Sequence, residues 1–363
     1  MDLRTKETIT TIAPGRVCLF GDHQDYLGLP IIASAIDRHI SLKAKKNNSK
    51  VFNIYKPDID TKESIAIDAV NENTNVIGDH FLAALKVVQR HGCIPTEGYD
   101  ITITGNIAIN AGISSSSAVL MTWVKFLLEA FCDKETDGEL AAEIAYQAEV
   151  IEQKSSGGKM DQYSIGLGNI IYLETDVESS YERIEKPLEG LIVGESGIPK
   201  KTLALLKELK EKSWLAISKV KEKLPDFTVK RAKIEELDNY LNYVEDDLKP
   251  YLYAAISNYN VTKNAQKEFA KETLDLKKIG ELINEHHVIL RDSLKITLPK
   301  IDNMINAALD SGAYGAKIVG SGKGGCIVAL SPPGKEKAII KAIKDAGGKD
   351  AYSVSIDPGV RVA

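Results

Sequence analysis

The segment NAGISSSSAVL (residues 110–120) is the part of the sequence that most constrains the fold. Gly112 precedes a run of four serines, and an apolar stretch follows. The four serines are Ser114, Ser115, Ser116 and Ser117. This order predicts a tight turn leading into a helix N-terminus, where backbone N–H groups and the helix dipole favour phosphate. A serine-capped helix without a ligand has the same pattern. No lysine follows in the G-x-x-x-x-G-K-[ST] arrangement, so the segment is not a P-loop.

Two further segments have polar and glycine-rich patterns of a similar kind. The first is APGRVCLFGDHQDYLG (residues 13–28), and the second is KIVGSGKGGCIVAL (residues 317–330). In the second segment, Gly322 and Gly324 are candidates for nucleotide binding, because glycine permits positive φ and a close approach of backbone N–H groups to phosphate. A flexible turn between two strands has the same composition.

In this order along the chain, the three segments resemble the motifs of the GHMP kinases, the superfamily of galactokinase, homoserine kinase, mevalonate kinase and phosphomevalonate kinase. The resemblance extends from Ala13 to about Arg361. The first segment is most similar to the galactokinase motif G-R-x-N-L-x-G-E-H-x-D-Y-x-x-G. It departs from that motif at Cys18, which replaces Asn, and at Asp22, which replaces Glu.

The resemblance implies an α+β fold with two domains. Residues 1–185 correspond to a GHMP kinase N-terminal domain like domain 2 of ribosomal protein S5. Residues 186–363 correspond to a ferredoxin-like GHMP kinase C-terminal domain. Two domains also agree with the length of 363 residues.

Hydrophobic periodicity predicts the elements around the motifs. It predicts separate strands over residues 31–35 and 39–44, and helices over residues 115–132 and 138–153. Residues 200–309 are mostly helical in pattern, and the sequence then alternates strand, glycine loop, strand, helix and strand. That order favours an α+β fold over a doubly wound parallel sheet.

Composition restricts the classes of function. Hydrophobic residues make up 44% and charged residues 27%, as is usual for globular proteins. The net charge of −5 gives no indication of a nucleic-acid partner. No N-terminal leader or apolar stretch of about 18 residues is evident, so we expect a cytoplasmic protein with no membrane contact. The four cysteines form no C-x-x-C pair and have apolar neighbours, which predicts buried thiols rather than disulfides or zinc.

The segment GGKMDQYSIGLGN (residues 157–169) resembles the galactokinase run G-x-M-D-Q. The resemblance implies that Asp161 is the catalytic base and that Gly158 lies at the substrate. It also implies that Arg16 lies close to Asp161 and the transferring phosphoryl group, for which a fixed planar charge is suited. A carboxylate beside a hydroxyl can accept its proton. The ordinary alternatives are a solvated loop aspartate and an arginine at a strand edge.

Glu149 lies twelve residues before Asp161, within the triplet Gln-Ala-Glu. This position resembles the metal-binding glutamate of galactokinase. The resemblance implies that Glu149 binds Mg²⁺ and that Ser116 supplies a second oxygen. Ser115 or Ser117 takes that place if the alignment shifts by one residue. An exposed surface glutamate is the alternative.

Asp22, His23 and Asp25 form a polar cluster suited to sugar hydroxyls. Carboxylates accept hydrogen bonds from hydroxyls, and a neutral imidazole either donates or accepts them. Two aspartates and a histidine also suit zinc. However, the chain has only six histidines and no H-x-x-x-H pattern, which favours the sugar interpretation.

Together these features predict an ATP- and Mg²⁺-dependent kinase that phosphorylates a monosaccharide at its anomeric hydroxyl, with galactose the leading candidate. The alternative enzyme is mevalonate kinase, and the alternative of another class is a catalytically silent regulator that binds sugar and ATP. Lys159 and Lys323 depart from the galactokinase pattern and suggest a substrate with its own negative charge, such as a uronic acid. The sequence does not indicate the oligomeric state.

Overall fold

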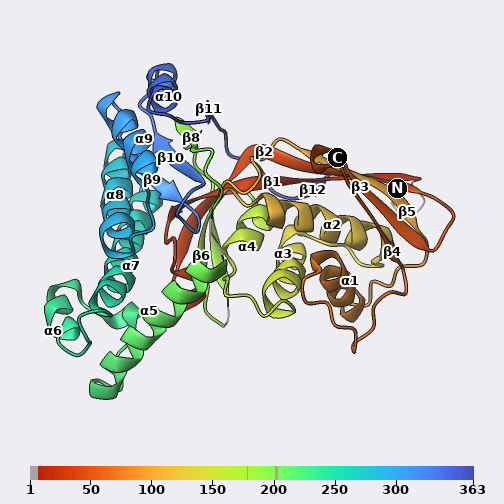
Figure 1. Ribbon diagram of the computed structural model, residues 1–363, viewed down its shortest axis with the longest axis horizontal. Coiled ribbons are helices and arrows are strands. Elements are labelled where there is room, and N and C mark those ends of the chain that lie inside the picture. The colour runs from red at the N-terminus through yellow and green to blue at the C-terminus, as the bar shows by residue number, and fades with distance from the viewer. Residues whose placement is uncertain (1–6, 178, 201–202) are drawn as a thin grey trace.

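The computed structural model describes residues 7–177, 179–200 and 203–363. Each of its two parts is a β-sheet with helices packed against it. In Figure 1 the larger sheet lies along the upper right with helices α1 to α4 beneath it, and the smaller sheet lies to the left beside the long helices. This arrangement confirms the α+β prediction.

The larger sheet has eight strands in the order β12-β1-β2-β5-β3-β4, with β6 paired to β2 and β7 paired to β6. The pairing of β3 with β5 is parallel, and the other described pairings of this sheet are antiparallel. The strands are β1 Thr8–Phe20, β2 Ile31–Lys46, β3 Val51–Lys56, β4 Thr61–Ala66, β5 Tyr99–Gly105, β6 Ile170–Glu174, β7 Ser180–Ile184 and β12 Arg361–Val362.

Helices cover one face of this sheet. They are α1 His80–Arg90, α2 Ser115–Phe131, α3 Gly138–Tyr146, the π-helical turn η4 Gln147–Ile151 and α4 Met160–Leu167. Asp79 caps α1 by accepting from the backbone N–H of Leu82 at 2.9 Å, which satisfies one of the free N–H groups of the first turn. Helix α2 is fixed to the sheet by aromatic packing, since the Trp123 ring lies edge-on to Phe52 with 5.1 Å between centroids.

The smaller sheet is antiparallel with the order β11-β8-β10-β9. Its strands are β8 Leu191–Glu195, β9 Gly315–Val319, β10 Cys326–Leu330 and β11 Asp350–Ser353. The helices of this part are α5 Leu203–Lys223, α6 Leu237–Leu241, α7 Lys249–Ala270, α8 Leu276–Val288, the π turn η7 Ile289–Ser293, α9 Pro299–Asp310 and α10 Glu336–Asp345. Within the described ranges, no helix has the length and apolar character needed to cross a membrane.

Two predicted elements differ in the structure. The predicted strands over residues 31–35 and 39–44 are one strand, β2, because β1 pairs with both halves and absorbs the irregularity as a register shift between Pro14 and Gly15. The predicted helix over residues 138–153 is α-helical only as far as Tyr146 and then continues as the π turn η4.

The chain changes from one sheet to the other between β7 and β8. Strand β7 ends at Ile184 in the larger sheet, and β8 begins at Leu191 in the smaller one. The chain then returns, because β12 pairs with β1 at the edge of the larger sheet. The predicted domain limits at residues 185 and 186 remain a prediction, but the last strand belongs to the first sheet.

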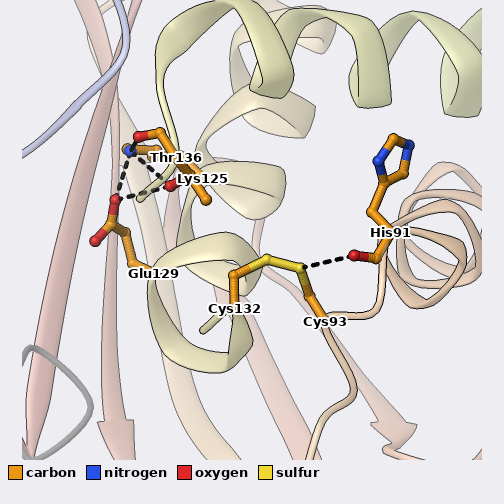
Figure 2. The surroundings of a disulfide bond; sticks show 6 residues. All are labelled: His91, Cys93, Lys125, Glu129, Cys132 and Thr136. Atoms are coloured by element: carbon orange, nitrogen blue, oxygen red, sulfur yellow. Dashed lines mark hydrogen bonds and ion pairs between the residues drawn. A yellow bond between two sulfur atoms is a disulfide. The ribbon is translucent and has the colours of Figure 1, made fainter. Parts of the chain in front are cut away.

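The prediction of four reduced thiols is wrong for two of them. Cys93, in the loop after α1, is joined by a disulfide to Cys132, the residue directly after α2 (Figure 2). Close by, Lys125 pairs with Glu129 at 2.5 Å and donates to the carbonyl of Thr136 at 2.9 Å. The disulfide could not be predicted from the sequence, because 39 residues separate the cysteines and only the packing of α1 against α2 brings them together. Cys18 and Cys326 are free and buried, as predicted.

We expect reduction of the Cys93–Cys132 bond to lower the free energy of unfolding by about 3–4 kcal/mol, because a crosslink that closes a loop of this length restricts the unfolded chain. Urea unfolding with and without dithiothreitol measures the change. The control variant Cys93→Ser should match the reduced protein and should not respond to dithiothreitol. Equal unfolding midpoints for the parent in the two conditions would contradict this expectation.

Candidate active site

A cavity of about 630 Å³ lies where the two domains meet. This volume is within the range of small-molecule sites. The first domain contributes most of its wall, and the second contributes Lys200, Leu206, Lys207, Gly320 and Ser321. Eight of the predicted site residues also line the cavity. They are Arg16, Asp22, His23, Asp25, Ser116, Glu149, Gly158 and Asp161.

An ion pair between Arg16 and Asp161 lies at the cavity wall. Arg16 comes from β1 and its side chain is only 3% exposed, whereas Asp161 lies in the first turn of α4. The Nε and Nη2 atoms of Arg16 lie 2.8 and 2.7 Å from Oδ1 of Asp161. Nη1 of Arg16 donates to the carbonyl of Gly112 at 2.7 Å. The guanidinium therefore fixes both the carboxylate and the turn before the serine run.

The charges around Asp161 keep it ionised. Burial alone would raise the pKa of Asp161, but the positive charges of Arg16 and Lys200 outweigh burial and hold that pKa below its ordinary value. Burial lowers the pKa of Lys200 below its ordinary value, although the negative charge of Asp161 acts to raise that pKa. One carboxylate thus has two cations beside it.

The serine run forms the predicted turn and helix N-terminus. Helix α2 begins at Ser115, and Ser114 before it has a left-handed φ of 63°. Ser116 lines the cavity, whereas Ser117 is buried and donates to Oε1 of Glu149 at 3.0 Å. The serine that contacts the predicted metal ligand is therefore Ser117, one of the two alternatives to Ser116.

Glu149 lies in the π turn η4, which extends the end of α3. Single π turns inside α-helices are frequent at functional sites. Gln162 holds the second carboxylate oxygen of Glu149, since its Nε2 donates to Oε2 at 2.7 Å. Burial, and next the negative charge of Asp161, raise the pKa of Glu149 above its ordinary value. A bound cation would offset both effects.

The turn between β9 and β10 meets the serine turn through backbone contacts. A Cβ at Gly112, where φ is 86°, would lie 2.9 Å from the carbonyl oxygen of Val319, so only glycine fits there. Gly322 and Gly324 do not belong to the cavity wall as the described residues define it. They pack against Ile296 and Ile198, respectively, and their role in nucleotide binding stays a prediction.

His23, Asp25 and Gly158 form the polar end of the cavity. A Cβ at Gly158 would lie 2.3 Å from Oδ2 of Asp25, so the glycine leaves room for that carboxylate. Burial, and next the charge of Asp161, raise the pKa of Asp25 to about 6. His23 accepts or donates at Nδ1 with the hydroxyl of Tyr26 at 3.1 Å, and its buried Nε2 has no hydrogen-bond partner. Burial lowers the pKa of His23 to about 4, so its ring is neutral at pH 7.

Asp22 differs from its two neighbours. It borders the cavity but is only 1% exposed, and its carboxylate is paired with Lys317 of β9 at 2.5 Å. Burial opposes ionisation of Asp22, but the charge of Lys317 prevails and lowers the pKa of Asp22 to about 2.

The structure does not support the two lysines taken as signs of an anionic substrate. Neither Lys159 nor Lys323 belongs to the described wall of the cavity. The amino group of Lys159 instead donates to the carbonyl of Asp176 at 3.0 Å and to the hydroxyl of Ser179. Lys159 directly follows Gly158 in the sequence, but the sequence does not show that its side chain is directed at Asp176 and Ser179.

Three family models match the chain in the order of its motifs. The galactokinase galactose-binding signature matches residues 4–46, the GHMP kinases N terminal domain matches residues 79–169, and the GHMP kinases C terminal model matches residues 265–349. Together they cover more than half of the 363 residues. The chain is a GHMP kinase.

Relatives of this GHMP kinase include two kinds of enzyme. A galactokinase from Streptococcus thermophilus is 28% identical over 346 residues, covering 92% of this chain and 88% of the relative. A mevalonate kinase from Pyrococcus abyssi is 27% identical over 358 residues, covering 96% of each. The crystal structure of Lactococcus lactis galactokinase complexed with galactose superposes with a TM-score of 0.86 at 23% identity, covering 98% of this chain and 95% of that one. The fold is thus the two-domain GHMP kinase fold.

GHMP kinases are phosphotransferases that use ATP as the phosphate donor. In this GHMP kinase the cavity also has a cation, Lys200, that sequence reasoning missed. Lys200 follows β8 in the segment Gly197–Lys200, for which the sequence predicted no site residue. Its backbone N–H donates to the carbonyl of Asn110 at 3.2 Å, so the serine segment itself positions it.

The donor set of this GHMP kinase suits a magnesium ion that is bound mostly by phosphate. The described residues contain no group of three or more His, Cys, Asp or Glu side chains arranged to hold a metal by themselves. Mg²⁺ in kinases is usually bound by one or two carboxylates together with substrate phosphates. Glu149, Ser116 and the buried Oε1 of Gln162, which has no hydrogen-bond partner, fit such a partial set.

Proposed function

We propose that this GHMP kinase transfers the γ-phosphoryl group of ATP to the anomeric hydroxyl of a monosaccharide, with galactose the leading candidate. One observation carries the proposal. The region matched by the galactose-binding signature contributes His23 and Asp25 to the same cavity that holds Asp161 and Arg16. The similarity to galactokinases, including one crystallised with galactose, agrees with this assignment.

Asp161 accepts the proton of the sugar hydroxyl. Both contacts from Arg16 go to Oδ1, which leaves Oδ2 for the hydroxyl. The hydroxyl oxygen forms a bond to the γ-phosphorus while the bond from that phosphorus to the bridging oxygen of ADP breaks. Because the pKa of Asp161 lies below its ordinary value, the carboxylate is ionised at pH 7 but is a weak base. Asp161 therefore orients the hydroxyl first and takes its proton as the new bond forms.

Positive groups surround the position of the phosphoryl group. Arg16 and Lys200 supply charge, and the N-terminus of α2 supplies backbone N–H donors at Ser115 and Ser116. Their placement by β1, the segment after β8 and the serine turn costs no rearrangement during the reaction. The cations neutralise charge on the equatorial oxygens as the phosphoryl group transfers.

Glu149 and Ser116 would hold Mg²⁺ together with the phosphates of ATP. The ion, when bound, neutralises charge on the β- and γ-phosphates. The protein itself orients the carboxylate of Glu149, because Ser117 donates to its Oε1 and Gln162 donates to its Oε2. This twofold support fixes the position of the Glu149 carboxylate in the cavity wall.

Mevalonate is the second candidate substrate, because a mevalonate kinase matches the chain over 96% of its length at 27% identity. The charges of the cavity argue against it. The polar end holds the carboxylate of Asp25 and the neutral ring of His23, and a substrate carboxylate at that end would face the like charge of Asp25. Neutral hydroxyls meet no such cost.

The substrate assignment is tested by measuring ADP release with ATP and Mg²⁺ over a panel of galactose, glucose, arabinose, fucose, galacturonate and mevalonate. We expect turnover of a neutral aldose, with galactose among the best. Turnover of mevalonate alone would contradict the sugar assignment. If none of these substrates leads to ADP release although the protein binds ATP, the result would instead support the regulator alternative.

We expect Asp161→Asn to lower kcat by roughly 10²–10⁴-fold, the usual contribution of a positioned proton acceptor. Binding of ATP should change little, because Arg16, Lys200 and the serine turn remain. Steady-state kinetics with ATP and the sugar measure both quantities. The exposed variant Asp345→Asn, in α10, serves as a matched control and should leave kcat unchanged. Near-parental kcat for Asp161→Asn would remove the residue from the mechanism.

The pH dependence of sugar binding should report Asp25. Its ionised carboxylate accepts hydrogen bonds from sugar hydroxyls, and its pKa of about 6 means that it gains a proton as the pH falls through 6. The value of kcat/KM for sugar should therefore fall below pH 6 and approach a tenfold loss per pH unit.

The variant Asp25→Asn is the control for this profile. It should raise KM for sugar at least roughly tenfold, since the hydroxyl loses a charged acceptor, and it should remove the inflection near pH 6. A parental profile that is flat between pH 5 and 7 would show that Asp25 does not bind the sugar in its ionised form.

A further inference from the structure

Asp22 lies in the turn after β1, in the motif predicted to bind sugar, but its carboxylate is directed at the second domain. Oδ2 lies 2.5 Å from Nζ of Lys317, and Oδ1 accepts from the backbone N–H of Gly320 at 2.9 Å. Lys317 is fully buried, and its amino group also donates to the carbonyl of Cys18 at 2.9 Å. Both oxygens of Asp22 are therefore engaged by β9 and the residue that follows it.

Because the ion pair is buried, its stability depends on the presence of both charges. Asp22 is 1% exposed and Lys317 is 0% exposed, so water screens neither side chain. His286 of α8 packs beside them, stacked on Phe20 with 6.1 Å between ring centroids, and burial keeps its ring neutral at pH 7. Removing one partner of such a buried pair leaves the other charge uncompensated, which is strongly unfavourable.

The pair also joins the two functional turns of the cavity. On the side of Asp22, the neighbouring His23 lines the polar end of the cavity. On the side of Lys317, Gly320 begins the glycine turn, and a Cβ there would lie 2.9 Å from the carbonyl oxygen of Gly112 in the serine turn. A displacement of β9 relative to the turn after β1 would therefore change the sugar side and the phosphate side together.

We propose that the ion pair of Asp22 and Lys317 is a latch between the domains, which positions the glycine turn that begins at Gly320 and the serine turn for nucleotide binding. Asp22 then does not bind a substrate hydroxyl. Asp22 and Lys317 are positioning residues, and recognition of hydroxyls is left to His23 and Asp25. The part of this inference that concerns hydroxyls rests on the proposed sugar kinase activity, whereas the latch itself does not.

The first experiment compares Asp22→Asn with Asp25→Asn. Kinetics are measured with ATP, galactose and its 2-, 4- and 6-deoxy analogues. The latch predicts that Asp22→Asn raises KM for ATP and for every sugar at least roughly tenfold, while the ratios of kcat/KM between galactose and each analogue stay within about twofold of the parent. For Asp25→Asn we expect the converse, with a changed ratio for at least one analogue and little change in KM for ATP. An Asp22→Asn variant that keeps the parental KM for ATP and changes one of these ratios would overturn the proposal.

The second experiment requires no turnover. Binding of a fluorescent ATP analogue is titrated for Asp22→Asn, Lys317→Met and the double variant, with urea unfolding as a parallel measurement. Each single variant should weaken nucleotide binding at least roughly tenfold and lower the unfolding midpoint. The double variant should bind no more weakly than the worse single variant and should unfold at a higher urea concentration than Lys317→Met, because no unpaired charge remains.

Additive losses in the double variant would show that the two residues act independently and would overturn the latch. If the single variants fail to fold, a folded double variant with weakened nucleotide binding supports the latch, and one with parental nucleotide binding overturns it. If the parent phosphorylates no sugar, the proposed function fails while these titrations still decide the latch.

Discussion

The ion pair between Arg16 and Asp161 is the interaction on which the arrangement of this site depends. It joins a strand of the larger sheet to the first turn of α4, and its third contact fixes the carbonyl of Gly112. A guanidinium that is 3% exposed needs such partners, because an unpaired buried charge is unfavourable by several kcal/mol. The same pairing that stabilises the buried arginine therefore also sets the geometry of the carboxylate and of the turn before the serine run.

Much of this site could be predicted from the sequence because local patterns encode it. The serine run, the triplet around Glu149 and the run around Asp161 each specify their own turn or helix end, and all three lie at one cavity in the structure. The α+β fold could be predicted as well, because strand and helix periodicities alternate along the chain. Short-range information was therefore enough to name residues that the fold brings to one cavity.

The features that the sequence did not predict depend on contacts between distant residues. The ion pair of Asp22 with Lys317 was not predicted, because 295 residues separate the two and no local pattern links them. Lys200 enters the cavity only because its backbone is hydrogen-bonded to Asn110. Cys93 and Cys132 meet because α1 packs on α2. In each case residue type was visible in the sequence, whereas the direction of the side chain was determined by packing.

Strand β1 has a free edge until Arg361 and Val362 have been made, since these residues pair with Ile12 and Thr11. Translation at about 5–20 residues per second separates the two segments by on the order of 20–70 seconds. During this interval β1 presents unpaired backbone groups that can pair with a neighbouring chain on the same ribosome cluster. The two pairs that β12 forms with β1 can therefore form only after nearly the whole chain has been synthesised.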